Sequence, residues 1–442
     1  MNDPQAGSDK SRTIKIDMMA RVEGEGALHI TVKEGQVQDV QLRIFEPPRF
    51  FEAFLQGRHV NEVPDIVARI CGICPVAYQM SAVHALEAIF GVEIPPAIRD
   101  LRRLLYCGEW IESHVLHIYM LQAPDFLGFA SGLDMARVHP DLVKQGLRLK
   151  KAGNQLITLL GGRSVHPVSV KIGGFSQVPT KDQLLGLKDE LLWARDAAVK
   201  TLQWVSGLAF EDPEQDYTFL SLRGHSEYPM NTGPLVTNEG HHLNASEFED
   251  HFHEEQVPYS TALHCTFQGK SYLTGPLARL ALNHDQLSPL TKEIFAETGF
   301  SLPLNRASMG IVARSVEVLY ALDEALRIIA GYEQPASPSV PVTINAGTGI
   351  AATEAPRGVL YHRYQVTEDG TIQLAKIIPP TSQNQRRMED DLRNMLPSLL
   401  HLSDEETAIK CERHIRSYDP CISCATHFLK FTKEVLPSSS QT

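Results

Sequence analysis

The sequence of 442 residues lacks the features of a membrane-spanning, secreted or nucleic-acid-binding protein. No stretch approaches the roughly 18–20 apolar residues that a membrane-spanning helix needs. Residues 1–12 are polar and lack the apolar core of a signal peptide, which predicts a cytoplasmic protein. Positive charge is also scarce: 41 Lys and Arg against 53 Asp and Glu give a net charge of −12. This balance argues against nucleic acid or an anionic membrane surface as a partner.

Cysteine is scarce as well, with seven residues in the whole chain. The odd number and the chain length do not suit a disulfide scaffold and favour a reducing compartment. Cys107, Cys265 and Cys411 stand apart from one another, and Cys107 lies in an apolar helical stretch. We therefore expect Cys107 to be a buried structural thiol.

Apolar residues recur at helical spacing along much of the chain. The helices predicted from this spacing cover residues 50–55, 76–90, 99–121, 180–208, 311–332 and 388–400. Hairpins are predicted at 27–44 and at 358–378, the second around a Glu-Asp-Gly turn. No repeat or linker divides the chain, so we expect one α+β domain, mostly helical, with small β elements near both termini. The polar ends, 1–12 and 437–442, are predicted to be disordered.

The remaining four cysteines form two Cys-x-x-Cys pairs. Residues 69–75 read RICGICP and residues 419–427 read DPCISCATH. Four thiolates can hold a soft transition metal. A structural zinc site usually keeps its cysteine pairs close in sequence, whereas these two lie about 350 residues apart, and a thioredoxin-like redox pair needs a βαβ unit. The spacing alone therefore leaves the metal open.

The residues around both pairs resemble the two signature motifs of the nickel–iron hydrogenase large subunit. The likeness starts at residues 20–24, ARVEG, and continues to His427. It implies the fold of that subunit, with a central bundle of long helices, and the reversible oxidation of dihydrogen to protons and electrons. It also implies a single domain over residues 1–427, followed by a C-terminal extension, 428–442, that a maturation endopeptidase removes.

The resemblance implies a specific role for each paired cysteine. Cys71 and Cys421 would be terminal thiolates on nickel, and Cys74 and Cys424 would bridge nickel and iron. In this family the iron also carries cyanide and carbon monoxide. Both metals accept thiolate ligands, so the chemistry of the residues agrees with the family.

Further residues match a second metal position. Residues 49–52, RFFE, resemble a short motif whose glutamate binds a magnesium (or iron) ion, which here would be Glu52. The other ligands would be His427 and a backbone carbonyl near Ile377. Relatives often have glycine within this motif, where this chain has phenylalanine. Taken alone, Glu52 would more often be an ordinary solvated helix residue.

Glu23 corresponds to the glutamate that relays protons between a nickel-bound thiolate and solvent in this family, and Cys421 would be the thiolate that accepts the proton. A carboxylate next to a thiol can exchange protons with it. Relatives usually have histidine where this chain has Glu25. Outside the motif, Glu23 would be read as a surface strand residue.

Pro356 and Arg357 resemble the segment that faces the iron and its diatomic ligands, where an arginine can donate hydrogen bonds to a cyanide. Thr381 would hydrogen-bond the second cyanide. Ser113 stands where membrane-associated relatives have aspartate. Residues 347–352, GTGIAA, suggest a dinucleotide loop only superficially, because they lack a βαβ context.

The resemblance also implies partners. The isolated cysteines cannot form an iron–sulfur cluster, so an iron–sulfur small subunit is required. The motifs are most similar to those of the cytosolic, bidirectional, NAD(P)-linked hydrogenases (sulfhydrogenases), which implies flavin and iron–sulfur subunits that reduce NAD(P). The alternatives are a hydrogen sensor, which generally lacks the extension, a respiratory-complex relative, which lacks the cysteines, and a structural zinc protein.

Overall fold

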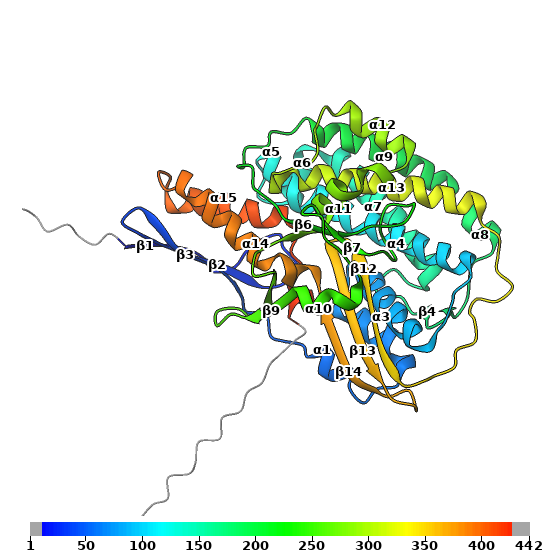
Figure 1. Ribbon diagram of the computed structural model, residues 1–442. Helices are drawn as coiled ribbons and strands as arrows, with labels where there is room; N and C mark the ends of the chain where they lie inside the picture. Colours follow the sequence, from blue (N-terminus) through cyan, green and yellow to red (C-terminus); the bar gives the residue numbers. More distant parts are fainter. Residues whose placement is uncertain (1–10, 427–442) are drawn as a thin grey trace, which may run out of the picture.

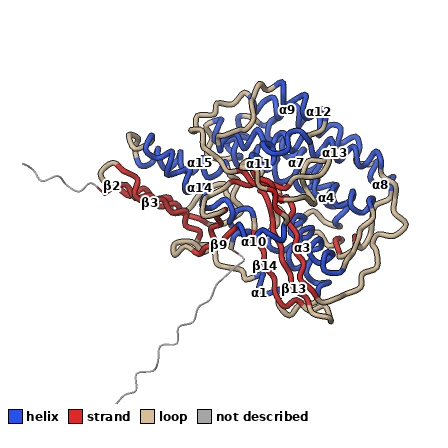
Figure 2. The backbone as a smooth tube through the Cα atoms, viewed as in Figure 1, coloured by secondary structure: helices blue, strands red, loops and turns tan. Residues whose placement is uncertain are grey.

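The structure is a computed structural model that describes residues 11–426. The α-helices are α1 (Phe51–Leu55), α2 (Val63–Val67), α3 (Pro75–Phe90), α4 (Pro96–Leu116), α5 (Ala123–Leu127), α6 (Gly132–Val138), α7 (Pro140–Gly161), α8 (Lys181–Leu185), α9 (Lys188–Ser206), α10 (Phe248–His251), α11 (Pro276–Asn283), α12 (Pro289–Glu297), α13 (Gly310–Gly331), α14 (Pro380–Met395), α15 (Asp404–Ser417) and α16 (Ile422–Ala425). The strands are β1 (Ser11–Ile16), β2 (Gly26–Lys33), β3 (Gln36–Ile44), β4 (Val170–Lys171), β5 (Gly174–Phe175), β6 (Phe219–Leu222), β7 (Leu235–Thr237), β8 (His242–Leu243), β9 (Phe252–Gln256), β10 (Leu263–Phe267), β11 (Leu273–Thr274), β12 (Gly347–Ala355), β13 (Gly358–Val366) and β14 (Ile372–Ile378). Figure 2 shows that helices make up most of the body, which confirms the mostly helical α+β class.

The long helices α4, α7, α9 and α13 pack against one another and form the central bundle that was predicted (Figure 1). Two glycines bring α4 and α7 close together. A Cβ atom on Gly153 would lie 2.7 Å from the carbonyl oxygen of Gly108, so neither position has room for a side chain. Cys107, next to Gly108, is fully buried in this bundle, as predicted.

A buried ion pair joins α4 to α13. Arg103 Nε lies 2.6 Å from Glu324 Oε1, and the same guanidinium donates to the Tyr320 hydroxyl. Arg327 also donates to Glu324. Burial by itself raises the pKa of Glu324, but the hydrogen bonds and charges of Arg327 and Arg103 outweigh it and lower the pKa to about 2.

The β-sheets lie on two sides of the bundle. Strands β12, β13 and β14 form an antiparallel sheet that packs on α3, and β1, β2 and β3 form a second antiparallel sheet beside α14 and α15 (Figure 1). Both predicted hairpins are confirmed, as β2–β3 and β13–β14. A mixed sheet in the order β11-β6-β7-β8 lies in the middle of the sequence. Its strands have two to four residues, which is too short for a periodic pattern to reveal.

Three predicted boundaries are wrong. The helix expected over 180–208 is α8 and α9, separated at Gly186; a capping box at Thr180 begins α8. The helix expected over 99–121 ends at Leu116 and continues as a π-helical turn, His117–Gln122. Apolar residues continue through both irregularities, as Leu184 and Leu187 in the first and Ile118 and Tyr119 in the second, so hydrophobic spacing could not reveal them.

The third boundary error concerns α14, which begins eight residues before the predicted start at 388. Its first turns carry polar residues that are nevertheless buried, from Thr381 to Gln385. At the N-terminus, the predicted disorder over 1–12 is wrong for residues 11 and 12, which belong to β1. The predicted disorder at 437–442 lies outside the described residues. Within the described part of the chain, no helix is long and apolar enough to cross a membrane.

We expect Glu324→Gln to destabilise the protein by about 2–3 kcal/mol at pH 7, because it removes the closer of the two charged partners of the buried Arg103, the other being Glu227 at 3.4 Å. Since the folded-state pKa lies below the ordinary value, the stabilising contribution is present above about pH 4.5 and is lost as the pH falls towards 2. Melting temperatures of wild type and variant should therefore converge between pH 5 and pH 3. Glu333→Gln, which removes an exposed partner of Lys181, serves as the control and should change little. An equal difference in melting temperature between wild type and variant at pH 5 and at pH 3 would contradict the stabilising role of ionised Glu324.

Candidate metal centre

The two cysteine pairs meet in the interior. The sulfur atoms of Cys71, Cys74, Cys421 and Cys424 all lie within 4.8 Å of one another, and all four residues are buried. The Sγ–Sγ distances are 3.5 Å for Cys71–Cys421, 3.5 Å for Cys74–Cys424 and 2.7 Å for Cys421–Cys424. The structure therefore brings together all four cysteines that the sequence singled out.

The first pair lies in the turn that leads into α3. Cys71 Sγ accepts the backbone N–H groups of Ile73 and Cys74. The N-terminus of α3 is capped from outside by Glu109 of α4, whose carboxylate accepts the N–H of Val76 at 2.6 Å and that of Ala77 at 3.1 Å. Glu109 thus fixes the end of the loop that carries both cysteines, a role that the sequence did not reveal.

The second pair follows α15 and is held by the N-terminal segment of the chain. The N–H of Ile422 donates to the carbonyl of Glu23 at 2.9 Å, and the N–H of Ser423 donates to the Glu23 carboxylate at 3.0 Å. The N–H of Cys421 donates to the hydroxyl of Thr381 at 3.0 Å. Glu23 and Thr381, both predicted site residues, therefore contact the cysteine loop directly.

Arg49 joins the two cysteine loops. Its Nη2 donates to the carbonyl of Ile70 at 2.7 Å and also to the carbonyl of Ser423, while its own N–H donates to Thr426 at 2.8 Å. In the sequence, Arg49 stands out only as part of the Glu52 motif. Its side chain reaches Ser423, 374 positions further along the chain, which no local pattern can indicate.

Arg357 lies at the tip of the β12–β13 hairpin and is buried beside the cysteines. It donates from Nε to the carbonyl of Asp419 at 2.7 Å and from Nη2 to the Asp419 carboxylate at 2.9 Å. Its Nη1 has no hydrogen-bond partner among the described residues. Burial lowers the pKa of Arg357, but the combined charges of Asp419, Cys421, Cys74 and Cys71 outweigh it and raise the pKa well above the usual value. Asp419, part of the second motif, thus has a role that the sequence analysis did not assign.

The thiols are strongly coupled. Hydrogen bonds from Cys421, Cys424 and Cys74 lower the pKa of Cys71 well below its usual value, with a smaller contribution from Arg357. Burial, by contrast, raises the pKa of Cys421. Four buried sulfurs within reach of one another, beside a guanidinium with a free donor, fit a thiolate-bound transition-metal centre that carries hydrogen-bond acceptors.

The predicted second metal position is only partly described. Glu52 lies in α1, and its carboxylate accepts the N–H of Ile377 at 2.7 Å, so these two predicted neighbours do meet. Burial raises the pKa of Glu52 to about 7, against the effect of the Ile377 N–H. His427 lies outside the described residues.

Three further sequence observations can be placed. Pro356 precedes Arg357 in the two-residue turn between β12 and β13. Ser113 is buried in α4, and its hydroxyl has no hydrogen-bond partner among residues 11–426. Residues 347–352 form part of β12, paired in register with β13, so they build a strand rather than a phosphate-binding loop.

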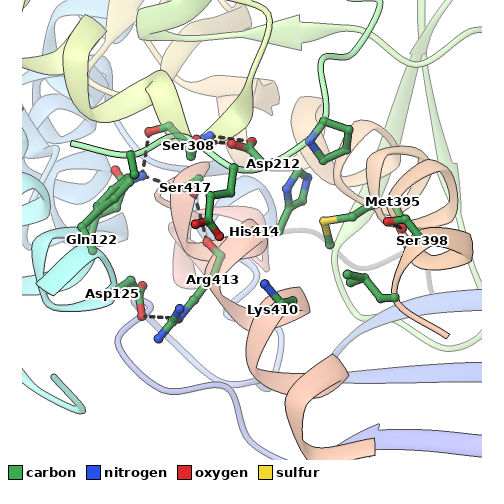
Figure 3. Close-up of a pocket in the computed structure, with 15 residues that line it drawn as sticks. Gln122, Asp125, Asp212, Ser308, Met395, Ser398, Lys410, Arg413, His414 and Ser417 are labelled. Carbon is green, nitrogen blue, oxygen red and sulfur yellow. Dashed lines mark hydrogen bonds and ion pairs between the residues drawn. The ribbon is translucent and has the colours of Figure 1, made fainter. Parts of the chain in front are cut away.

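A cavity of about 270 Å³ lies beside α15, away from the cysteines. Figure 3 shows Gln122, Asp212 and Ser417 around it, with Arg413 reaching towards Asp125. Arg413 lies 3.5 Å from Asp125, and Asp212 accepts the N–H of Ser308 at 3.0 Å. Its described lining contains none of the four cysteines, so this cavity is not the metal centre.

These observations define a buried metal centre built from two distant cysteine pairs and covered by an arginine. Comparison with known proteins identifies the family. The chain belongs to the family described as nickel-dependent hydrogenase, whose profile matches residues 49–141 and 221–427.

Relatives match the chain over nearly its whole length. Sulfhydrogenase 2 subunit alpha of Pyrococcus furiosus is 32% identical over 425 residues, which cover 94% of this chain and 99% of the relative. The NAD-reducing hydrogenase HoxS subunit beta of Cupriavidus necator is 27% identical, with 95% of each chain covered. A crystal structure of an NAD⁺-reducing [NiFe]-hydrogenase in the H2-reduced state superposes with a TM-score of 0.86 at 25% identity, over 95% of this chain and 100% of that one.

We expect Cys71→Ser, Cys74→Ser, Cys421→Ser and Cys424→Ser each to lower bound nickel and iron severely, because each removes one thiolate from a shared cluster. Metal content per chain, measured by mass spectrometry of the purified protein, tests this. Cys107→Ala is the matched control, since this cysteine is also fully buried but lies outside the cluster. Stoichiometric zinc without nickel or iron in the wild type, or full metal content in a cluster variant, would contradict the assignment.

Proposed function

We propose that this chain is the catalytic large subunit of a nickel–iron hydrogenase that interconverts dihydrogen with two protons and two electrons. The observation that carries the proposal is the cluster of four buried cysteines beside Arg357. The membership of the chain in the nickel-dependent hydrogenase family supports the same reaction.

Cys71 and Cys421 would serve as terminal ligands of nickel, and Cys74 and Cys424 as bridges to iron. When bound, the metal pair supplies Lewis acidity that polarises dihydrogen. The iron would carry cyanide and carbon monoxide. The unpartnered Nη1 of Arg357 supports a hydrogen bond to one cyanide. The Thr381 hydroxyl accepts the N–H of Cys421, so its own proton remains available for a second cyanide. Pro356 would add apolar surface on the same side.

The protein's own residues would then move the proton. Cys421 Sγ accepts it, and Glu23 takes it towards solvent. The main chains of Glu23 and Cys421 are paired, and the Glu23 carboxylate already contacts the cysteine loop through Ser423. The Ser423 hydroxyl in turn donates to Glu46 at 3.0 Å, which extends the polar path outward. Glu23 is half-buried, a position suited to exchange between an enclosed thiolate and water.

A second metal position would lie at the edge of the centre. Glu52 and His427 would hold a magnesium (or iron) ion together with a backbone carbonyl near Ile377. The raised pKa of Glu52 supports this role, because a buried carboxylate is stabilised by a nearby cation.

Electrons must leave through a partner, since the described cysteines outside the cluster are isolated. We expect an iron–sulfur small subunit and, beyond it, flavin and iron–sulfur subunits that reduce NAD(P). Relatives named sulfhydrogenase and NAD-reducing hydrogenase support this arrangement. A cytoplasmic location agrees with seven cysteines that are free thiols.

We expect the purified complex to oxidise dihydrogen with an artificial electron acceptor, and Glu23→Gln to lower this rate about 100-fold. Glutamine keeps the acceptor for the Ser423 N–H but cannot carry a proton, and acid–base groups contribute about 10²–10⁴ in rate. Nickel and iron contents should be unchanged. Glu25→Gln, two residues away and exposed, is the matched control.

Two results would count against these assignments. A fully metallated wild type without dihydrogen oxidation would overturn the proposed function. A fully metallated Glu23→Gln variant with wild-type turnover would overturn the proton route alone.

We expect residues 428–442 to be removed after His427 in the active enzyme, because the family commonly processes its large subunit at this histidine. Intact-mass spectrometry of the active complex tests this. The expected mass is that of residues 1–427, whereas an active subunit that retains the extension would contradict the proposal.

A further inference from the structure

Arg357 lies on a hairpin tip that is buried instead of exposed. Strands β12 and β13 pair up to Ala355 and Gly358, which leaves only Pro356 and Arg357 in the turn. Hairpin tips usually end in solvent, where water satisfies their carbonyl groups. A buried tip needs protein donors instead, because an unpaired buried carbonyl is costly.

Arg279 of α11 supplies these donors. Its Nη1 donates to the carbonyl of Ala355 at 2.9 Å, and its Nη2 donates to the carbonyl of Pro356 at 2.8 Å. Trp110 Nε1 donates to the preceding carbonyl, that of Glu354, at 3.2 Å. Three consecutive carbonyls leading up to Arg357 therefore accept from fully buried side chains.

Arg279 is itself held rigidly. Glu317 of α13 accepts from Nε and Nη2, both at 2.7 Å, and Glu354 accepts from Nη1 at 2.9 Å. With the two carbonyls, each of its five N–H groups has an acceptor. The guanidinium also lies over the ring of Trp110, 4.3 Å from its centroid. Lysine, with three donors on a flexible stem, cannot reproduce this planar set.

The start of α11 contacts the same tip from the other side. Gly275, with φ of +117°, lies so close to Arg357 that a Cβ atom there would be 2.7 Å from the Arg357 carbonyl oxygen. The N–H of Arg279 donates to the carbonyl of Gly275 at 2.8 Å, so the two residues are one helical turn apart. The first turn of α11 thus fixes the backbone on both sides of the Arg357 Cα atom.

We propose that Arg279 is a positioning residue for dihydrogen oxidation: it fixes the hairpin tip so that Arg357 stays on Asp419 and over the cysteine cluster. This inference rests on the proposed function. The contacts form one continuous path from α13 through Glu317 and Arg279 to the tip, and from Arg357 to Asp419, two residues before Cys421. A displacement of the tip would move the free Nη1 of Arg357 away from the metal ligands.

The test is a double-mutant cycle of Arg279→Lys and Arg357→Lys in the complete, metallated complex. Arg279→Lys should lower kcat for dihydrogen oxidation about ten- to a hundredfold, because a small misplacement of a reacting group is enough for such losses. Its KM for dihydrogen should stay within about twofold, and its nickel and iron contents should match the wild type. In the Arg357→Lys background, Arg279→Lys should cause no further loss, since it acts only through Arg357.

Arg102→Lys is the matched control. Arg102 is also fully buried in a bidentate pair, with Glu87 at 2.6 and 2.8 Å, but its contacts lie at α3 and β4. Arg102→Lys should lower stability with kcat unchanged.

Hydrogen–deuterium exchange of the metal-free protein gives a readout without activity: exchange across 355–359 should rise in Arg279→Lys and stay unchanged in Arg102→Lys. If Arg279→Lys fails to fold, Glu317→Gln is the alternative, because it weakens the pair of hydrogen bonds that Glu317 accepts from Arg279. It should lower kcat about threefold to tenfold, and it should cause no further loss in the Arg357→Lys background.

The results separate the two proposals. An equal kcat loss in both backgrounds, or a loss explained entirely by missing metal, would overturn the positioning role while leaving the proposed function intact. A fully metallated wild type that does not oxidise dihydrogen would overturn the proposed function itself.

Discussion

The central constraint on this fold is that two cysteine loops about 350 residues apart must hold four sulfurs within 4.8 Å of one another. Within residues 11–426, no strand ladder or helix pair joins the loops. The contacts that do so run mainly between a side chain and a distant backbone: Arg49 reaches Ile70 and Ser423, Glu23 caps the second loop, and Thr381 accepts from Cys421. Because each of these hydrogen bonds comes from a single side chain, one substitution can remove it. The geometry of the centre therefore depends on residues spread over the whole chain.

This arrangement buries many charged side chains, which are stable in the interior only when opposite charges and hydrogen-bond partners surround them. Arg279 satisfies that condition with five acceptors. Arg357 does not, because its Nη1 lacks a partner among the described residues. A buried donor that lacks a partner and lies beside the four cysteines is what a binding position requires, since the missing acceptor can then be supplied by a ligand.

The sequence predicted the centre better than the frame that holds it. The cysteines, Glu23, Arg357 and Thr381 sit within motifs, so their neighbours identified them, and the structure gathers them at one place. Arg279 and Glu109 carry no such local signal, because their hydrogen-bond partners lie far away in sequence. The early start of α14 was missed for a related reason: its first turns bury polar residues for the site, so apolar spacing could not reveal a helix. In the first turns of α14, buried polar residues thus replace the apolar spacing on which helix prediction depends.

The way in which the second cysteine pair is held also bears on how the centre assembles. Cys421 and Cys424 are almost fully buried between the Glu23 segment, the first turn of α14 and the first cysteine loop. A metal cannot reach four enclosed sulfurs without displacing part of this packing, and the segment after α15 has only short-range structure of its own, the four-residue α16. It is therefore the element that can insert last, over a metal already held by Cys71 and Cys74. The cut proposed above, after His427, would fit that order if it follows the insertion of this segment.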